Sequence, residues 1–466
     1  MSELSSASEN QDQVTPGRPA RWGRWIQHWE PEDAEFWAGT GRAVATRNLI
    51  FSIFTEHIGF CVWSLWSVLV LFMGPRYGFS IADKFLLTST PTLVGSVLRI
   101  PYNLAVARFG GRNWTIVSAV LLLIPTSACA LVMQPGTSLG TFVAVAALAG
   151  FGGGNFASSM TNINAFYPGR RKGWALGLNA GGGNLGVAVV QLIGLAVLGT
   201  AGAEHPKLML WVFIPLVVIS AVCAVLFMDN LAGVRNDTHA LRDAVRDKHS
   251  WVISVLYIGT FGSFIGYSFA FGLVLQNQFH RTPVQAAAVT FLGPLLGSLF
   301  RPIGGWLADR WGGAKVTFLD FAAMTLCAPL LIAATQAASL PLYTASFIAL
   351  FLFSGIGNGS VYKMIPAVFH QQAVAAIAAG QPGLDAWGQA RRMSGALIGI
   401  AGAVGGLGGV LINLAFRQSF ASAHTGTPAV IGFVVFYAGC FALTWWVYLR
   451  RRTSAVGTDP LVAVRV

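Results

Sequence analysis

Long apolar segments follow one another along almost the whole chain, and they constrain the fold more than any other feature. A helix needs about 20 mostly apolar residues to cross a bilayer. Open sheet edges would leave backbone groups unpaired in lipid, so we expect these segments to be helices rather than strands. The twelve predicted spans are 47–73, 86–107, 113–133, 140–165, 173–199, 209–229, 250–275, 286–308, 315–337, 341–369, 393–416 and 428–449.

The composition supports a protein that lies within a membrane. Only 10% of the 466 residues are charged and 54% are hydrophobic, whereas roughly 25% of an average soluble domain is charged. The formal net charge of +12 could suggest a nucleic-acid partner, but the basic residues are confined to short connections between apolar segments. We therefore expect the lipid bilayer, and no nucleic acid, as a partner.

Lysine and arginine also predict the orientation and the domains. With a cytoplasmic N-terminus, the inner connections carry most of the basic residues, and only five lie in the outer ones. This asymmetry favours an even number of spans in an inner (plasma) membrane, with both termini cytoplasmic. The predicted parts are a polar, disordered tail over 1–44, six-helix halves over 45–229 and 250–450, a cytoplasmic linker over 230–249, and a cytoplasmic tail over 451–466.

The two predicted halves repeat each other. Arg99 and Arg301 match at an offset of 202 residues, Asn155 and Asn358 match at 203, and glycines of spans 5 and 11 match at 223. The jump in offset falls in 371–391, which we interpret as a loop. Two parallel six-helix halves predict an all-α membrane protein with the twelve-helix fold of the major facilitator superfamily, whose sites lie at the midplane between halves.

A loop motif gives independent support for this fold. The stretch from Gly305 to Lys315, Gly-Trp-Leu-Ala-Asp-Arg-Trp-Gly-Gly-Ala-Lys, resembles the loop signature of that superfamily. Its partner in the first half runs from Asn103 to Arg112, where Ala107 takes the place of the aspartate. We interpret this loop as structural and gating, so its charges are not substrate ligands.

Arg99 and Arg301 are the strongest candidates for a binding site. Each lies near the middle of an apolar span, where a charged side chain costs about 2.5–3.5 kcal/mol on insertion scales. One explanation is a structural ion pair, although Glu56 is the only acid predicted deep in a span. The other is a paired clamp on an anion, since guanidinium is planar, permanently charged and presents its donors as a fork.

Glycine runs and amides surround these positions in the sequence. The runs lie in spans 4, 5, 10 and 11, where glycine permits either close helix packing or close backbone approach to a small ligand. Buried amides could donate to that ligand or hydrogen-bond between helices. The candidate site residues are Gly181, Gly182, Gly183, Gly405 and Gly406, the amides Asn155, Asn184 and Asn358, and the aromatics Phe156, Tyr257 and Phe261.

These stretches together resemble the nitrate/nitrite porter family, the NarK type within the major facilitator superfamily. The most specific are Gly-Ser-Val-Leu-Arg-Ile-Pro-Tyr-Asn around Arg99 and Gly-Asn-Gly-Ser-Val-Tyr-Lys-Met-Ile-Pro around Asn358. The resemblance implies an anion held between Arg99 and Arg301. It also implies that glycine-rich segments matching 173–186 and 402–409 enclose the anion, with Asn184 and the three aromatics as further contacts.

The resemblance implies transport by alternating access, with nitrate and nitrite as partners. An empty site with two unneutralised arginines would disfavour return of the empty carrier, so exchange of nitrate for nitrite is the expected mode. Proton symport stays open, because Glu56 and His57 are titratable. A carrier of a small organic anion is a further alternative. The chain has no Walker A loop, metal-spaced cluster or nucleophile elbow, so we expect no enzyme, cofactor or metal site.

Overall fold

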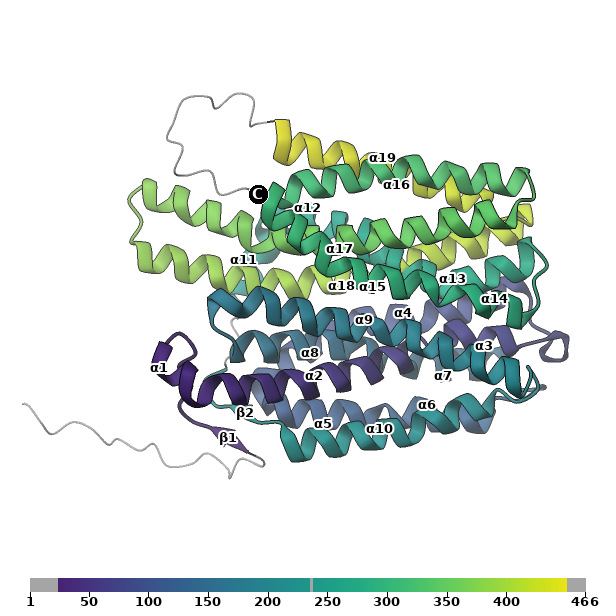
Figure 1. The fold of residues 1–466 in the computed structure, drawn as a ribbon, viewed down its shortest axis with the longest axis horizontal. Coiled ribbons are helices and arrows are strands. Elements are labelled where there is room, and N and C mark those ends of the chain that lie inside the picture. Colours follow the sequence, from purple (N-terminus) through teal and green to yellow (C-terminus); the bar gives the residue numbers. More distant parts are fainter. Residues whose placement is uncertain (1–23, 235–237, 451–466) are drawn as a thin grey trace, which may run out of the picture.

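The computed structural model describes residues 24–234 and 238–450. Within them, twelve helical rods run along the long axis of the molecule in two halves of six (Figure 1). The N-terminal half comprises α2 (Arg42–Trp63) with α3 (Trp66–Phe72), α4 (Ile81–Phe109), α5 (Gly111–Leu121) with α6 (Leu123–Val132), α7 (Leu139–Ala149) with α8 (Phe151–Phe166), α9 (Gly169–Thr200) and α10 (Lys207–Phe227).

The C-terminal half repeats this arrangement. It comprises α12 (Lys248–Tyr257) with η3 (Ile258–Gly262) and α13 (Ser263–Gln278), α14 (Pro283–Thr290) with α15 (Leu292–Trp311), α16 (Gly313–Gln336), α17 (Leu340–Ala378), α18 (Gly383–Ala423), and α19 (Thr427–Thr444) with η4 (Trp445–Leu449). Short elements outside the rods include η2 (Pro75–Tyr77) and α11 (Thr238–Arg246). The predicted order and type of the spans are confirmed.

Eleven of the described rods are long and apolar enough to cross a membrane. The remaining rod, α4, carries Asp83, Lys84, Arg99 and Arg108 within its 29 residues, which lowers its mean hydropathy. It packs against α8 and α18 rather than standing alone. The midspan charge of α4, Arg99, is therefore on the face that other helices bury, and the twelve-helix fold class is confirmed.

Both described chain ends lie at one end of the bundle, which we call the termini end (Figure 1). At the opposite end the two halves interlock through α4 and α18. The ring of Phe85 stacks on Phe416 and Phe420 with centroids 5.8 and 5.6 Å apart. The Thr88 hydroxyl donates to the Asn413 side chain over 2.9 Å. Contacts between the halves are thus tight at the opposite end.

The predicted disordered tail is wrong for its described part, residues 24–44. There β1 (Trp25–Ile26) pairs in parallel with β2 (Asn230–Leu231), and α1 (Ala34–Phe36) leads through η1 (Trp37–Gly41) into α2. The indole of Trp29 donates to the carbonyl of Phe166 over 3.2 Å. The segment is thus fixed onto the N-terminal half, whereas 1–23 and the predicted tail 451–466 lie outside the described residues.

The predicted loop over 371–391 is also wrong. Helix α17 continues to Ala378 and α18 begins at Gly383, so only 379–382 form the turn. Alanine dominates the sequence before the turn, and alanine is the best helix former. The backbone of Gly380, at φ +96°, supplies the left-handed conformation that ends α17. The two helices therefore project beyond the bundle as a hairpin at the termini end (Figure 1).

Candidate functional site

Arg99 and Arg301 meet between the two halves. Arg99 lies in α4 and is 0% exposed, and Arg301 lies in α15 and is 4% exposed. The Arg99 Cζ atom is 4.6 Å from the centroid of the Phe156 ring, and the Arg301 Cζ atom is 5.9 Å from the same centroid. A guanidinium within about 6 Å of an aromatic face is attracted by the ring quadrupole. One ring of α8 therefore positions a cation from each half.

The hydrogen bonds of the two guanidinium groups leave donors free. Arg99 donates through Nε to the Gly153 carbonyl at 3.2 Å and through Nη1 to the Gly402 carbonyl at 2.6 Å. Arg301 donates through Nη2 to the Tyr257 hydroxyl at 3.2 Å. Among the described residues, Nη2 of Arg99 and Nη1 of Arg301 have no partner. Buried donors without partners are costly, so these two atoms suit a small acceptor ligand.

No ion pair within the described chain satisfies either arginine. The five pairs found there involve other cations, and neither Arg99 nor Arg301 belongs to any of them. The structural explanation for the two midspan charges, an ion pair with an acid, is therefore not supported. Two cations remain in a low-dielectric setting, where an anion between them would be bound strongly.

Aromatic rings form a stack around the arginines. Tyr257 ends α12, and Phe261 lies in the π-helical turn η3. Their rings are stacked at 5.2 Å with an angle of 7°, and Phe261 stacks on Phe156 at 6.1 Å. The Arg99 Cζ atom is 4.7 Å from the Phe261 centroid. Single π-helical turns often mark functional positions, and here the turn brings both rings to one side of the site.

Two aromatic contacts of the arginines, and the two backbone carbonyls that accept from Arg99, are absent from the predicted site residues. Tyr362 of α17 lies 5.3 Å from the Arg301 Cζ atom, and Trp63 of α2 lies 5.4 Å from that of Arg99. The carbonyls are those of Gly153 and Gly402; Gly402 belongs to the predicted segment 402–409, but its role as an acceptor for Arg99 was not predicted. Tyr362 lies in the stretch Gly-Asn-Gly-Ser-Val-Tyr around Asn358, which carries the family resemblance, so the sequence did indicate this region. The rotation of each helix, which the sequence does not specify, decides whether Trp63 and the two carbonyls reach Arg99.

The predicted glycines of α18 are sites of close packing. A Cβ atom at Gly405 would stand 2.4 Å from Cδ1 of Tyr257, and one at Gly406 would stand 2.4 Å from the Ser96 hydroxyl. Both distances are shorter than real Cβ contacts. Gly405 therefore makes room for the ring that binds Arg301, and Gly406 makes room for α4.

The predicted glycines of α9 divide into two kinds. A Cβ atom at Gly182 would stand 2.4 Å from the Ile53 side chain, and one at Gly183 would stand 2.2 Å from Oε1 of Glu56. These two glycines permit contact between α9 and α2. Gly181 differs, because a Cβ atom there would meet open space.

The predicted amides are buried and, among the described residues, make no hydrogen bond to the arginines. Asn155, Asn184 and Asn358 are 3%, 0% and 0% exposed. Within the described chain, no amide atom of the three has a hydrogen-bond partner. Asn155 lies against α2, since a Cβ atom at Gly59 would stand 2.6 Å from its Nδ2 atom. Their unpaired groups remain available to a ligand or to water.

A buried carboxyl lies near the arginines. The Oε2 atom of Glu56 accepts a hydrogen bond of 2.7 Å from Asn179, which also contacts the Ser159 hydroxyl at 2.6 Å. Glu56 interacts electrostatically with Arg301 and Arg99, although neither guanidinium is within ion-pair distance. Its titratable side chain was noted in the sequence, and the structure places it beside the site.

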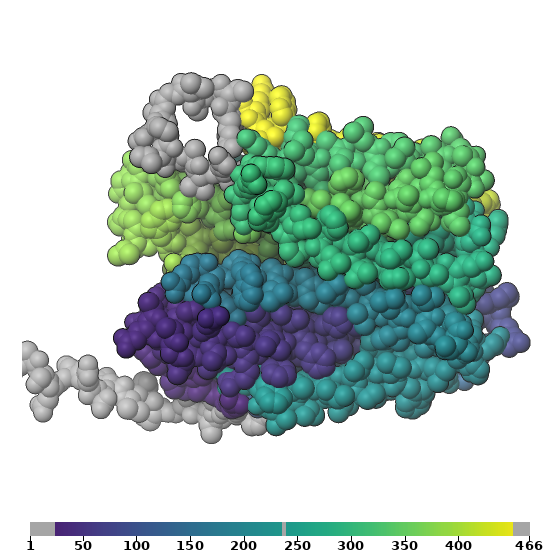
Figure 2. Space-filling view, in the orientation of Figure 1, coloured from purple at the N-terminus to yellow at the C-terminus, as the bar shows by residue number. Residues whose placement is uncertain are grey.

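A cavity of about 390 Å³ leads from Arg301 toward the termini end. Its walls come from both halves, since α9 supplies one side and α15 and α17 supply the other. Figure 2 shows the molecular surface hollowed at the termini end, between the blue N-terminal half and the yellow-green α18. The lining includes Gly173, Trp174, Tyr362, Lys363 and Asp309.

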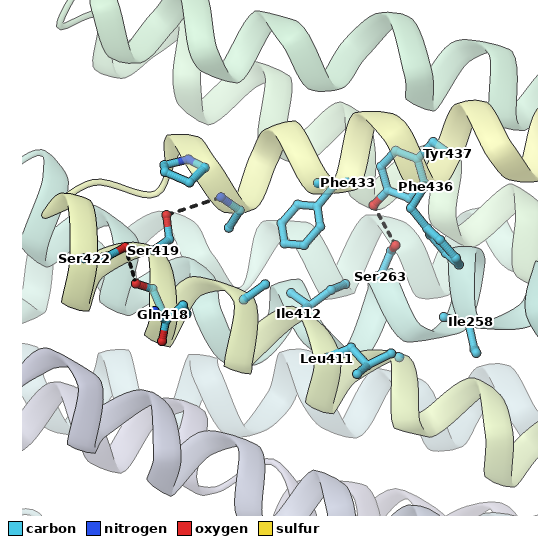
Figure 3. Close-up of a pocket in the computed structure, with 15 residues that line it drawn as sticks. Ile258, Ser263, Leu411, Ile412, Gln418, Ser419, Ser422, Phe433, Phe436 and Tyr437 are labelled. Atoms are coloured by element: carbon cyan, nitrogen blue, oxygen red, sulfur yellow. Dashed lines mark hydrogen bonds between the residues drawn. The ribbon is translucent and has the colours of Figure 1, made fainter.

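A second cavity, of about 410 Å³, lies within the C-terminal half and away from the arginines (Figure 3). Helices α18 and α19 line it with Leu411, Ile412, Phe433 and Phe436, and the Tyr437 hydroxyl shares a 2.7 Å hydrogen bond with Ser263. Leu411 is 57% exposed on the outer surface of the bundle. This apolar groove therefore faces lipid, and none of the predicted site residues lines it.

The sequence model of the Major Facilitator Superfamily matches residues 52–384. The nitrate/nitrite transporter NarU of Salmonella typhimurium is 36% identical over 448 residues, covering 92% of this chain and 96% of that protein. The probable nitrate/nitrite antiporter NarK2 of Thermus thermophilus is 33% identical over 460 residues, covering 92% and 97%. The chain belongs to the nitrate/nitrite porters of the major facilitator superfamily. It is accordingly a multi-pass inner-membrane transporter and not an enzyme.

Solved structures of other major facilitator proteins share the fold. The nucleoside transporter NupG superposes with a TM-score of 0.61 at 12% identity, covering 86% of this chain and 100% of that one. A bacterial homologue of the lysosomal transporter Spinster, in an inward-facing and unoccupied conformation, gives 0.59 at 16% identity, covering 86% and 96%. At such low identity these likenesses concern the fold alone.

Proposed function

We propose that this porter carries nitrate and nitrite across the inner membrane, with the anion bound between Arg99 and Arg301. The observation that carries the proposal is the pair of buried guanidinium groups on the Phe156 ring, with donors left free and no acid in ion-pair contact among the described residues. The names of the relatives, which include nitrate/nitrite transporters and a probable antiporter, agree with this substrate class.

The chemistry of the site suits a small flat anion. Nitrate is planar with three equivalent oxygens, and a guanidinium fork can donate to two of them in that plane. Two free donors, one from each half, could therefore hold the ion from opposite sides. The stacked rings of Tyr257 and Phe261 add an apolar wall beside these donors.

Exchange of nitrate for nitrite follows from the electrostatics. Two cations in an apolar setting repel each other when no anion is present. A conformational change is driven only by a difference in affinity between states. The loaded carrier would therefore cross between its two orientations more readily than the empty one. We assign the termini end to the cytoplasm because most basic residues lie there, so the cavity beside Arg301 would open inward.

The decisive experiment uses purified protein in liposomes. Nitrite is loaded inside, nitrate is added outside, and both fluxes are followed with and without a pH gradient. We expect nitrate uptake that needs internal nitrite and is indifferent to the pH gradient. Absence of anion flux under every gradient would reject the proposed function.

Glu56 favours one competing mode, proton-coupled uptake of nitrate. Its buried carboxyl lies in the field of both arginines and could exchange a proton as the anion binds. In the liposome experiment this mode would give uptake without internal anion that depends on the pH gradient. Replacing Glu56 by Gln would then abolish the gradient dependence, while leaving exchange as the only remaining flux.

A further inference from the structure

An ion pair stands at the outer end of the cavity that begins at Arg301. The Lys363 ammonium group donates to both carboxylate oxygens of Asp309, at 2.8 and 2.9 Å. Asp309 lies eight residues beyond Arg301 on α15, which is roughly 12 Å along a helix. The cavity therefore has a cation at each end. Arg301 lies at the end deep in the bundle, and Lys363 lies nearer the termini end, where Asp309 pairs with it.

We propose that Lys363 is a second anion site at the cytoplasmic mouth of this cavity, and that Asp309 occupies its ammonium group between passages of the substrate. The inference rests on the proposed function, and it adds a site that the two central arginines do not include. The ligand would be a small monovalent inorganic anion, nitrate or nitrite, held before it reaches Arg301 or after it leaves.

The repeat between the halves argues against a purely structural role for the pair. At the offsets that match Arg99 with Arg301 and Asn155 with Asn358, the counterparts of Asp309 and Lys363 are Ala107 and Met160. Helices α4 and α8 of the first half nevertheless pack together as α15 and α17 do. Packing of these helices therefore does not require the two charges. The pair occurs only in the C-terminal half, which indicates a role specific to the cytoplasmic side of that half.

The exposure of the pair suits exchange of partners. The side chains of Lys363 and Asp309 are 36% and 60% exposed, and ion pairs exposed to this extent contribute little to stability. Water at the mouth could replace either partner at small cost. An arriving anion would compete with Asp309 for the ammonium group, whereas a buried pair would resist such competition.

The position of the ammonium group places it on the route between the halves. A Cβ atom at Gly173 of α9 would stand 3.4 Å from Nζ of Lys363, so the lysine reaches across from α17 to the N-terminal half. Because Asp309 neutralises the ammonium group of Lys363, an anion does not stay bound there permanently. When an anion binds Lys363, Asp309 moves toward solvent, and the next cation along the cavity lining is Arg301.

The test compares the two faces of the membrane. Right-side-out and inside-out vesicles are prepared from cells that express the full chain and lack other nitrate carriers, and the KM for labelled nitrate in the medium is measured on each. For Lys363→Gln we expect the KM at the cytoplasmic face to rise about fivefold, because loss of a charge at the edge of a site mainly weakens capture. The KM at the other face should stay within measurement error.

Two further variants keep the test decisive if Lys363→Gln fails to reach the membrane. Asp309→Asn leaves the ammonium group unpaired and should lower the KM at the cytoplasmic face, and Lys363→Arg should keep it near that of the wild type. Lys248→Gln is the matched control, since it removes a lysine at the same end outside the cavity. Added inert salt should raise the wild-type KM at the cytoplasmic face through screening, and Lys363→Gln should lose this dependence.

The outcomes separate the two proposals. A wild-type protein that moves no nitrate in either vesicle would reject the proposed function itself. Wild-type exchange combined with equal shifts at both faces in Lys363→Gln, or with no shift in Asp309→Asn, would overturn the second anion site and leave the function intact.

Discussion

Arg99 and Arg301 share one aromatic ring, with their Cζ atoms 4.6 and 5.9 Å from the centroid of Phe156. One arginine belongs to the N-terminal half and the other to the C-terminal half. An anion between them would touch both halves at once, so its binding energy would depend on how the halves are oriented. Such a dependence is what alternating access requires of a central site.

Arg301→Lys should abolish most exchange. Lysine keeps the charge but loses the planar fork and its bond to the Tyr257 hydroxyl. We expect kcat/KM for nitrate to fall about ten- to a hundredfold, the range for a hydrogen bond to a charged group. Arg76→Lys is the matched control, because Arg76 pairs with Glu204 at an exposed position. Liposome exchange assays would contradict the clamp if both variants behaved alike.

Phe156→Leu should weaken nitrate binding without unfolding the protein. Leucine fills similar space but has no ring quadrupole, so both guanidinium groups lose their cation–π attraction to the Phe156 ring. We expect the KM for nitrate to rise about fivefold, as loss of one cation–π contact near the site would give. Phe441→Leu serves as the control, since Phe441 stacks on Phe318 far from the arginines. Equal KM values for the two variants would refute a positioning role for the ring.

Gly405→Ala should disturb the site through Tyr257. The added methyl group would stand 2.4 Å from Cδ1 of that ring, so the ring must move away from its stack on Phe261 and from Arg301. We expect at least a tenfold loss of exchange, on the order of one lost charged hydrogen bond. Gly395→Ala, on the same helix, meets open space and should keep wild-type exchange. Full activity of Gly405→Ala would show that Tyr257 does not need its present position.

The membrane fold was predictable because lipid imposes a simple rule on the sequence. Each crossing needs an apolar segment of a set length, so the rods and their order could be read from hydropathy. That rule does not apply to the hairpin formed by the ends of α17 and α18, because the hairpin projects beyond the membrane-spanning part of the bundle. Its helices are specified by propensity and by mutual packing, and neither leaves a long apolar run that marks a helix over 371–391.

The site was predictable in part, for a related reason. A charge in the middle of a span is conspicuous, and the repeat paired Arg99 with Arg301. The aromatics came from the family resemblance, since nothing in their spacing distinguishes Phe156 from a phenylalanine that fills the bundle. The segment 402–409 also came from the resemblance, but the hydrogen bond from Arg99 to the Gly402 carbonyl could not be predicted. A helical carbonyl normally accepts from its own helix, and only the rotation of α18 brings this one to Arg99.

Asp229→Asn should destabilise the protein and leave the affinity of the site unchanged. The Asp229 carboxylate, 5% exposed, accepts from Arg24 at 3.0 Å and from Arg47 at 2.6 Å, and Asn48 donates to it at 2.9 Å. These bonds hold the strand β1 against the end of α10. An amide keeps one acceptor but loses the charge, so we expect a loss of about 1.5–3 kcal/mol, the range for hydrogen bonds to charged groups. A thermal unfolding scan of the purified protein should show a lower Tm, while the KM for nitrate stays that of the wild type. Asp243→Asn, at an exposed position of α11, provides the comparison. An equal Tm for the two variants would mean that the N-terminal segment does not stabilise the bundle.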